Sequence, residues 1–127
     1  MITRTLFFFL ALSLTLGACA GRPAAPKASL ENRVAEYVRL RDAADLDALY
    51  LLFSPAYRAQ TTRNQFIRKY NMTHTNSRVE SITVQDRKAE VVVIGDARIL
   101  GVNIPGQRLT TSWVLVDEEW YIEPKKP

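Results

Sequence analysis

Residues 111–122 read TSWVLVDEEWYI, two short runs of β-branched and aromatic side chains separated by acidic residues. This pattern predicts a β-hairpin, because such side chains fit a pleated and half-buried surface. We expect a connection with an even number of residues, because it gives the hairpin one continuous apolar face, whereas an odd number would place the two tryptophans on opposite faces. The residues on that apolar face are Trp113, Leu115, Trp120 and Ile122.

Upstream of this hairpin β-branched residues continue to dominate, and the chain is expected to form an antiparallel meander. Val91–Ile94 is continuously apolar, as expected for a central strand with both faces covered. Gly95 lies inside the strand pattern and predicts a bulge or a bend. The expected strands are 79–84, 88–100, 109–116 and 120–124, with a turn at 85–87 and a longer loop at 101–107.

In the first half of the domain the apolar spacing is that of amphipathic helices. Ser29 and Asp45 each precede an apolar run and are expected to cap the first two helices. Thr62 begins the T-x-x-Q spacing of a capping box. Ser54 and Pro55 are expected to end the second helix, because proline disfavours helical backbone in the residue before it. The expected helices are 30–41, 46–53 and a third that begins after Thr62, followed by a polar loop at 71–77.

Three helices followed by a curved four-stranded antiparallel sheet make an α+β fold, with the helices on one face of the sheet. Two segments carry a resemblance to a known family: residues 45–55, DLDALYLLFSP, with Tyr57 and Arg58 after them, and the hairpin 111–122. They are similar to the second helix and the closing hairpin of the nuclear-transport-factor-two-like superfamily. This cone-shaped, cystatin-like fold is shared by ketosteroid isomerase and the SnoaL-type polyketide cyclases. The glycine that the family commonly has in its last turn is absent here.

The N-terminus has the pattern of an export signal. Arg4 precedes the apolar run 6–16, which is shorter than the roughly 20 residues that a helix needs to cross a bilayer. The run ends in LGAC at 16–19, which resembles the lipobox of bacterial lipoproteins. The resemblance implies cleavage between Ala18 and Cys19 and a diacylglyceryl thioether on Cys19. The alternative is a plain secretory signal that happens to contain a cysteine.

The expected organisation is a signal peptide at 1–18, a lipidated cysteine with a Pro/Ala tether at 19–28, and a folded domain at 29–127. Several acyl chains would hold the protein on a membrane permanently. By resemblance to enterobacterial lipoproteins, Ala20 favours the outer membrane, with the domain facing the periplasm. Cys19 is the single cysteine of the chain, so the sequence excludes an internal disulfide, a cysteine-rich metal site and, once lipidated, a cysteine nucleophile.

Composition excludes further classes of function. The chain has 127 residues, 47% hydrophobic and 24% charged, which is typical of one globular domain and not of a disordered chain. The formal charge of +4 is spread along the sequence, without the clustered basic and aromatic residues of a nucleic-acid interface. His74, the one histidine, is expected to be a solvated residue of the 71–77 loop, because one ligand does not make a metal site. We therefore expect no nucleic acid, metal or cofactor.

The superfamily resemblance implies a pocket where the curved sheet opens, in which enzymes place an Asp or His base and a Tyr or Asp donor. Aspartates that could serve are Asp45, Asp47 and Asp96, although capping and the helix dipole account for the first two. The candidate tyrosines lie on apolar helical faces, which favours a position in the core. The aromatic candidates for the pocket are Tyr37, Tyr50, Tyr70, Trp113 and Trp120.

Three functions are consistent with these features. The leading expectation is a non-catalytic lipoprotein whose cone-shaped domain binds a protein partner or a small apolar ligand. The alternative is a small isomerase, dehydratase or cyclase that uses a pocket Asp and Tyr as acid and base. A third is an assembly factor that forms a homodimer through the sheet, as relatives of this fold often do. No residue is assigned a catalytic role, because a fold alone does not imply a reaction.

Overall fold

The computed structural model describes residues 28–70 and 72–126. The predictions for residues 1–27, namely the signal peptide, the lipidated Cys19 and most of the tether, lie outside these ranges. Within the described ranges, no helix combines the length and the apolar character that a membrane span requires.

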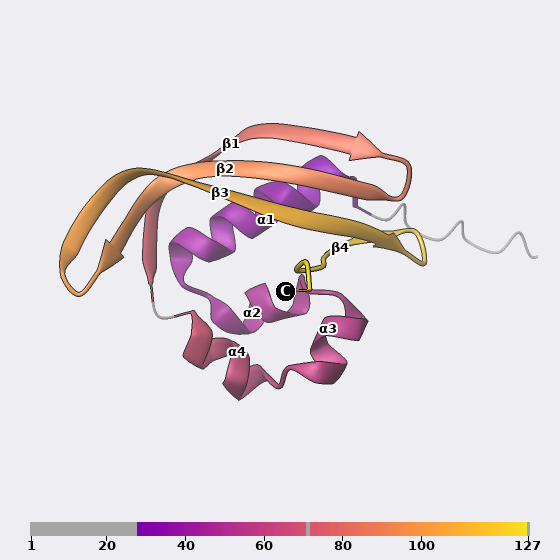
Figure 1. The fold of residues 1–127 in the computed structure, drawn as a ribbon, viewed down its shortest axis with the longest axis horizontal. Helices are drawn as coiled ribbons and strands as arrows, with labels where there is room; N and C mark the ends of the chain where they lie inside the picture. The colour runs from indigo at the N-terminus through magenta and orange to yellow at the C-terminus, as the bar shows by residue number, and fades with distance from the viewer. Residues whose placement is uncertain (1–27, 71, 127) are drawn as a thin grey trace, which may run out of the picture.

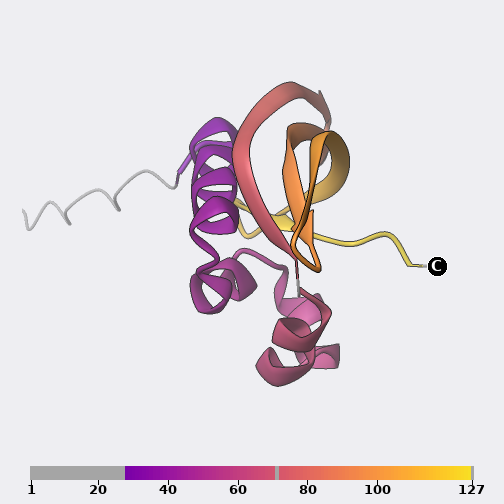
Figure 2. The ribbon, with the colours of Figure 1, turned by 90° about the vertical axis from the view of Figure 1, so that its left-hand side faces the viewer.

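In these ranges four helices precede four strands, and the strands form one antiparallel sheet in the order β1-β2-β3-β4. Figure 1 shows α1 lying along one face of the sheet, with α2, α3 and α4 further below on the same side, and the turned view in Figure 2 shows β1 curving strongly beside α1. The α+β arrangement is confirmed, but four helices are described where three were expected. The elements are α1 (Leu30–Ala43), α2 (Leu46–Leu51), α3 (Pro55–Gln60), α4 (Arg63–Lys69), β1 (Thr73–Gln85), β2 (Lys88–Ile99), β3 (Val102–Val116) and β4 (Glu119–Ile122).

The helix caps that the sequence predicts are present. Ser29 and Asp45 each accept a hydrogen bond at 3.2 Å from the backbone N–H three residues further on, at the starts of α1 and α2. Thr62 and Gln65 form both hydrogen bonds of the capping box at the start of α4. These bonds satisfy amide groups that have no partner inside the helix, so local sequence determines where the helices begin.

The additional helix is α3, and it begins where the sequence predicted only a helix end. The expected helix 46–53 is shorter in the structure, because α2 ends at Leu51. Ser54 then caps α3 by accepting a hydrogen bond from Tyr57 N at 3.0 Å, and Pro55 takes the first helical position, where its missing N–H costs no hydrogen bond. The prediction of three helices was wrong because serine followed by proline starts a helix here as well as ending one.

The polar segment predicted as a loop at 71–77 is largely part of a strand. β1 begins at Thr73, and its pairing with β2 continues through Thr75 to a register shift that ends at Arg78. Pattern reasoning missed this part of the strand because its side chains are mostly polar, whereas the ladder is formed by backbone groups.

The loop predicted at 101–107 is reduced to a two-residue turn. Leu100 and Gly101 connect β2 to β3, which begins at Val102 and continues through Pro105. The proline is tolerated because β4 pairs only with the far end of β3, so that Pro105 lies on an edge of the sheet.

Gly95 lies at an irregularity, as its position predicts. The pairing of β2 with β3 shifts register between Gly95 and Ala97. A Cβ added at Gly95 would lie 2.6 Å from Ser77 Oγ and 3.0 Å from Ser77 Cα. Here β1 approaches β2 more closely than a side chain at position 95 would allow.

The even connection predicted for the last hairpin is confirmed. Trp113 pairs with Ile122, and Leu115 pairs with Trp120, so these four residues share one face. The two-residue turn at 117–118 has positive φ at both positions, which is the conformation of a type I′ turn. This turn forms without the glycine that usually favours it.

The core lies between the helices and one face of the sheet. Val34 and Tyr37 of α1 and Val91 of β2 belong to one hydrophobic cluster and are at most 1% exposed. Val92 and Ile94 point to the opposite face of the sheet and are only partly buried. The prediction that both faces of this strand are covered was wrong, because the described helices all pack on one side.

Candidate functional site

Two of the five aromatic candidates fill the space between α1 and the sheet. Tyr37 and Trp113 are each 1% exposed, and their rings meet edge to face with centroids 6.0 Å apart. Aromatic pairs in this geometry add to the stability that burial provides. Side chains therefore fill the interior between α1 and the sheet where Tyr37 and Trp113 meet.

The other three candidates lie elsewhere. Tyr50 and Tyr70 belong to the helical layer, where their rings contact Phe66 at centroid distances of 5.3 and 4.4 Å. The Tyr50 hydroxyl donates a hydrogen bond of 2.6 Å to a backbone carbonyl between α3 and α4. Trp120 is partly buried at the edge of the core, and its carbonyl accepts a hydrogen bond of 3.0 Å from Arg33 Nε. The five aromatic candidates do not converge on one cavity.

The three aspartates that could act as bases are engaged by partners outside the core. Asp45 caps α2, and Asp47 forms an ion pair with Arg63. Asp96 accepts hydrogen bonds of 3.1 Å from Asn76 Nδ2 and from a backbone N–H. The hydrogen bond from Arg63 lowers the pKa of Asp47, and the one from Asn76 lowers the pKa of Asp96. Because a carboxylate with a lowered pKa is a weaker base, these positions do not favour acid–base catalysis.

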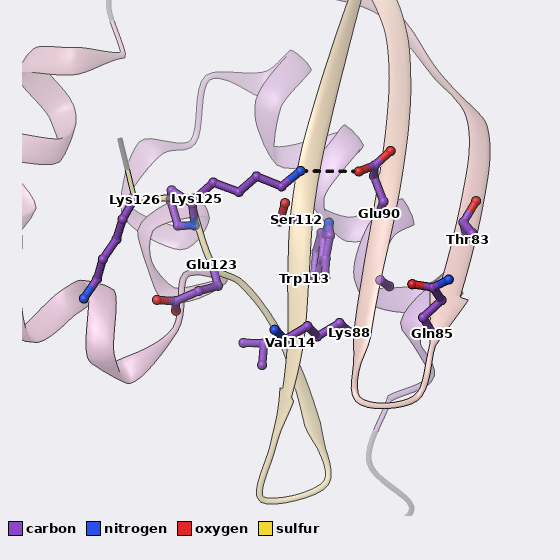
Figure 3. Close-up of a pocket in the computed structure, with 12 residues that line it drawn as sticks. Thr83, Gln85, Lys88, Glu90, Ser112, Trp113, Val114, Glu123, Lys125 and Lys126 are labelled. Carbon is purple, nitrogen blue, oxygen red and sulfur yellow. Dashed lines mark ion pairs between the residues drawn. The ribbon is translucent and has the colours of Figure 1, made fainter.

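A groove of about 630 Å³ lies against the sheet beside the C-terminal tail. Figure 3 shows Lys125 reaching over Ser112 towards Glu90, and the two charged groups are 3.6 Å apart. Polar side chains such as Thr83 line much of the groove, and Trp113 is the one aromatic candidate among its lining residues. An exposed ion pair of this kind contributes little to stability, so it can open without a large cost.

A buried pair of polar residues that the sequence did not single out joins α1 to β1. Arg41 and His74 are each 7% exposed, and Arg41 Nη2 lies 2.9 Å from His74 Nδ1. Because arginine has only donors, Nδ1 accepts this hydrogen bond and the neutral imidazole carries its proton on Nε2. The prediction of a solvated loop histidine was wrong, because β1 extends to this residue and turns it inward. The available signal was the helical spacing that Arg41 shares with Val34 and Tyr37.

The guanidinium of Arg41 is buried and has no counter-ion in the described part of the chain. Among residues 28–70 and 72–126, no carboxylate forms an ion pair with it. Its Nε and Nη1 atoms are buried without a hydrogen-bond partner, and its Cζ lies 6.0 Å from the centre of the Tyr37 ring. Burial raises the pKa of Tyr37 and of Tyr70, and Arg41 opposes the rise in both. Buried donors without acceptors lower the stability of a fold, so Nε and Nη1 of Arg41 are available to donate hydrogen bonds to a ligand.

The stability of the fold is expected to depend on pH through His74. Burial lowers the pKa of His74 below its usual 6.5, the charge of Arg41 lowers it further, and Asp42 acts in the opposite direction. Above pH 6.5 the imidazole is neutral in the folded and in the unfolded chain. As the pH falls below this value, the unfolded chain binds the proton first, so the free energy of unfolding decreases, by at most about 1.4 kcal/mol per pH unit.

Urea unfolding at about pH 7.5 and about pH 5.5 measures this loss, because histidine titrates between them. The matched variant is His74→Asn, which keeps an acceptor near the position of Nδ1 and has no titratable group. The loss of stability between the two pH values should be smaller in His74→Asn than in the parent. Equal losses in the two proteins would contradict the assignment to His74.

Comparison with known proteins gives a fold and no family. No protein family model matches the sequence, and no curated protein matches it. Similar solved structures include a SEC-C-motif-containing protein from Psychrobacter arcticus, with a TM-score of 0.61 and 12% identity, over 80% of this chain and 62% of that one. This chain therefore spans less than two thirds of that protein.

A second similar structure is a protein named as an NTF2-like transpeptidase from Campylobacter jejuni. The TM-score is 0.53 at 12% identity, over 76% of this chain and the whole of that one. At identities this low, the similarity shows a shared fold and says nothing about function. The chain described here has the NTF2-like, or nuclear-transport-factor-two-like, fold that its closing hairpin and second helix resemble.

Proposed function

We propose that this chain is a membrane-anchored bacterial lipoprotein whose domain binds a small apolar ligand without catalysing a reaction. A protein partner is the alternative occupant of the same surface. The single observation that carries binding is the exposed apolar surface at residues 99–109, which we call the β2–β3 arm. The anchor rests on the lipobox resemblance at 16–19.

The arm exposes several large apolar side chains that would be buried if they served the core. Leu100 is 100% exposed, Val102 62% and Leu109 40%. Ile99 pairs directly with Val102, so these two side chains share a face of the sheet. Contiguous exposed apolar residues on a small domain are typical of binding surfaces.

The position of the arm suits a protein anchored through its N-terminus. In Figure 1, α1 begins at the right of the molecule, whereas the turn between β2 and β3 lies at the far left. A tether that ends at residue 28 would therefore attach the domain to a membrane at one end and leave the arm at the other. Such an arrangement supports binding in the periplasm and not contact with the lipid surface.

The positions of the candidate aspartates do not favour the alternative function of a small isomerase, dehydratase or cyclase. It requires a carboxylate base next to a tyrosine in the interior. Asp45, Asp47 and Asp96 are instead held by a helix end, by Arg63 and by Asn76.

Replacement of Cys19 by serine is expected to move nearly all of the protein from the membrane fraction to the soluble fraction. The change removes the thiol that would carry the acyl chains, and burial of those chains supplies the membrane affinity. The measurement is fractionation of cells that express the parent and the variant. Ala28→Ser, at the other end of the tether, is the matched control and should stay with the membrane. A Cys19→Ser protein that stays with the membrane would refute the anchor.

A further inference from the structure

We propose that the ligand is a fatty-acid-like molecule, whose carboxylate binds Arg41 and whose hydrocarbon body lies along the β2–β3 arm. This inference rests on the proposed function, because it names the chemistry of the apolar ligand. It combines two features of residues 28–70 and 72–126: a buried cation that has no counter-ion among them, and an apolar surface that none of them covers.

The guanidinium of Arg41 is the cation, and an anion is the partner that suits it. Arg41 is only 7% exposed, its Nε and Nη1 have no acceptor among the residues that the structure describes, and its Nη2 is hydrogen-bonded to His74. A carboxylate matches the geometry of a guanidinium and binds it through charge-assisted hydrogen bonds. It would supply acceptors to donors that are costly to leave unpaired.

The surroundings of Arg41 favour an anion with a single charge. His74 is neutral in this environment, so it adds no second cation for a dianion such as a phosphate. Tyr37 and Tyr70 have raised pKa values and keep their hydroxyl protons, so they do not repel a carboxylate. Tyr70 is only partly buried and follows directly after α4.

The register of the sheet connects the cation to the arm. His74 pairs with Ala97, and Ala97 pairs with Ile104, so the three side chains form one row across the inner face. Directly opposed residues have Cβ atoms about 5 Å apart, which places Ile104 about 10 Å from His74. The exposed pair Ile99 and Val102 lies next to this row, nearer the turn. His74 and Ala97 are buried, so the hydrocarbon body would lie over the less buried residues Ile104, Ile99 and Val102.

The test is a calorimetric titration of the full chain in phosphatidylcholine vesicles, with empty vesicles as the blank. The probes are octanoate, octan-1-ol, which lacks the carboxylate, and acetate, which lacks the body. Octanoate is expected to bind at least about tenfold more tightly than either of the others, because it alone engages both the cation and the arm.

Two variants separate the head from the body. Arg41→Met should weaken octanoate binding at least about tenfold while leaving octan-1-ol unchanged. Val102→Ser should weaken both ligands, and Val84→Ser, at an exposed valine of β1 that lies outside the arm, should weaken neither. Should Arg41→Met fail to fold, the comparison of octanoate with octan-1-ol and the Val102→Ser variant still decide the question.

The outcomes distinguish this inference from the proposed function. Equal binding of octanoate and octan-1-ol, both weakened by Val102→Ser, would leave the arm as an apolar binding site and overturn the role of Arg41. No binding of any probe would overturn the inference, and Cys19→Ser would still judge the anchor independently. Self-association that Val102→Ser abolishes would also overturn it, because a second copy would then cover the arm.

Discussion

Replacement of Trp113 by alanine is expected to lower the free energy of unfolding by about 3–5 kcal/mol. Trp113 is 1% exposed and packs edge to face on Tyr37, and its Nε1 donates a hydrogen bond of 3.0 Å to Thr111 Oγ1. Alanine would leave a cavity between α1 and β3 that the surrounding strands can close only in part. Urea unfolding followed by circular dichroism measures the change. A loss of this size is a large fraction of the total stability of a small domain.

Trp120 provides the matched control on the same face of the same hairpin. It is only partly buried and packs at the margin of the core. Trp120→Ala should therefore cost about 1–2 kcal/mol, clearly less than Trp113→Ala. Equal losses in the two variants would contradict the placement of Trp113 at the centre of the core.

Replacement of Gly95 by alanine is expected to lower the free energy of unfolding by about 1–3 kcal/mol. The added Cβ would meet Ser77 Oγ at 2.6 Å and Ser77 Cα at 3.0 Å, so β1 would have to move away from β2. Ser77 cannot move freely, because its N–H donates a hydrogen bond of 3.0 Å to Asp42 Oδ2 and its hydroxyl bonds to the same carboxylate. The strain would therefore spread to the end of α1. Urea unfolding of the parent and Gly95→Ala measures the cost.

A double-mutant cycle with Ser77→Ala tests the origin of this cost. Removing the Ser77 hydroxyl removes the nearest atom to the added Cβ, although the backbone of residue 77 stays close to it. The cost of Gly95→Ala should be smaller in the Ser77→Ala background than in the parent, because the two side chains meet directly. Additive costs would show that the strain arises elsewhere, and a neutral Gly95→Ala would contradict the close approach of the strands.

Features that depend on neighbouring residues could be predicted from the sequence. Ser29, Asp45 and Thr62 cap the helices that follow them, because a cap involves backbone groups only three residues away. The pairing of Trp113 with Ile122 follows from the parity of a two-residue turn. Both depend on spacing along the chain and on no distant contact.

The errors occurred where one local signal had two meanings or where pairing involved only the backbone. A serine followed by a proline can end one helix or begin another. Here Ser54 and Pro55 begin α3, and the sequence prediction considered only the end of a helix. The polar strand that begins at Thr73 has no apolar pattern, because its ladder with β2 is formed by N–H and C=O groups.

The sequence by itself determined the α+β order of this domain, the helix caps, the bulge at Gly95 and the common face of the two tryptophans. Only the tertiary structure decided which groups meet at the end of α1. Arg41 and His74 are 33 residues apart in the chain, and their contact exists because β1 folds back over α1. The same packing leaves the β2–β3 arm uncovered, because the helices cover only part of the inner face of the sheet. Spacing along a chain specifies contacts between residues a few positions apart. The burial of a side chain such as Arg41, and whether its charge has a partner, depend on how distant segments pack.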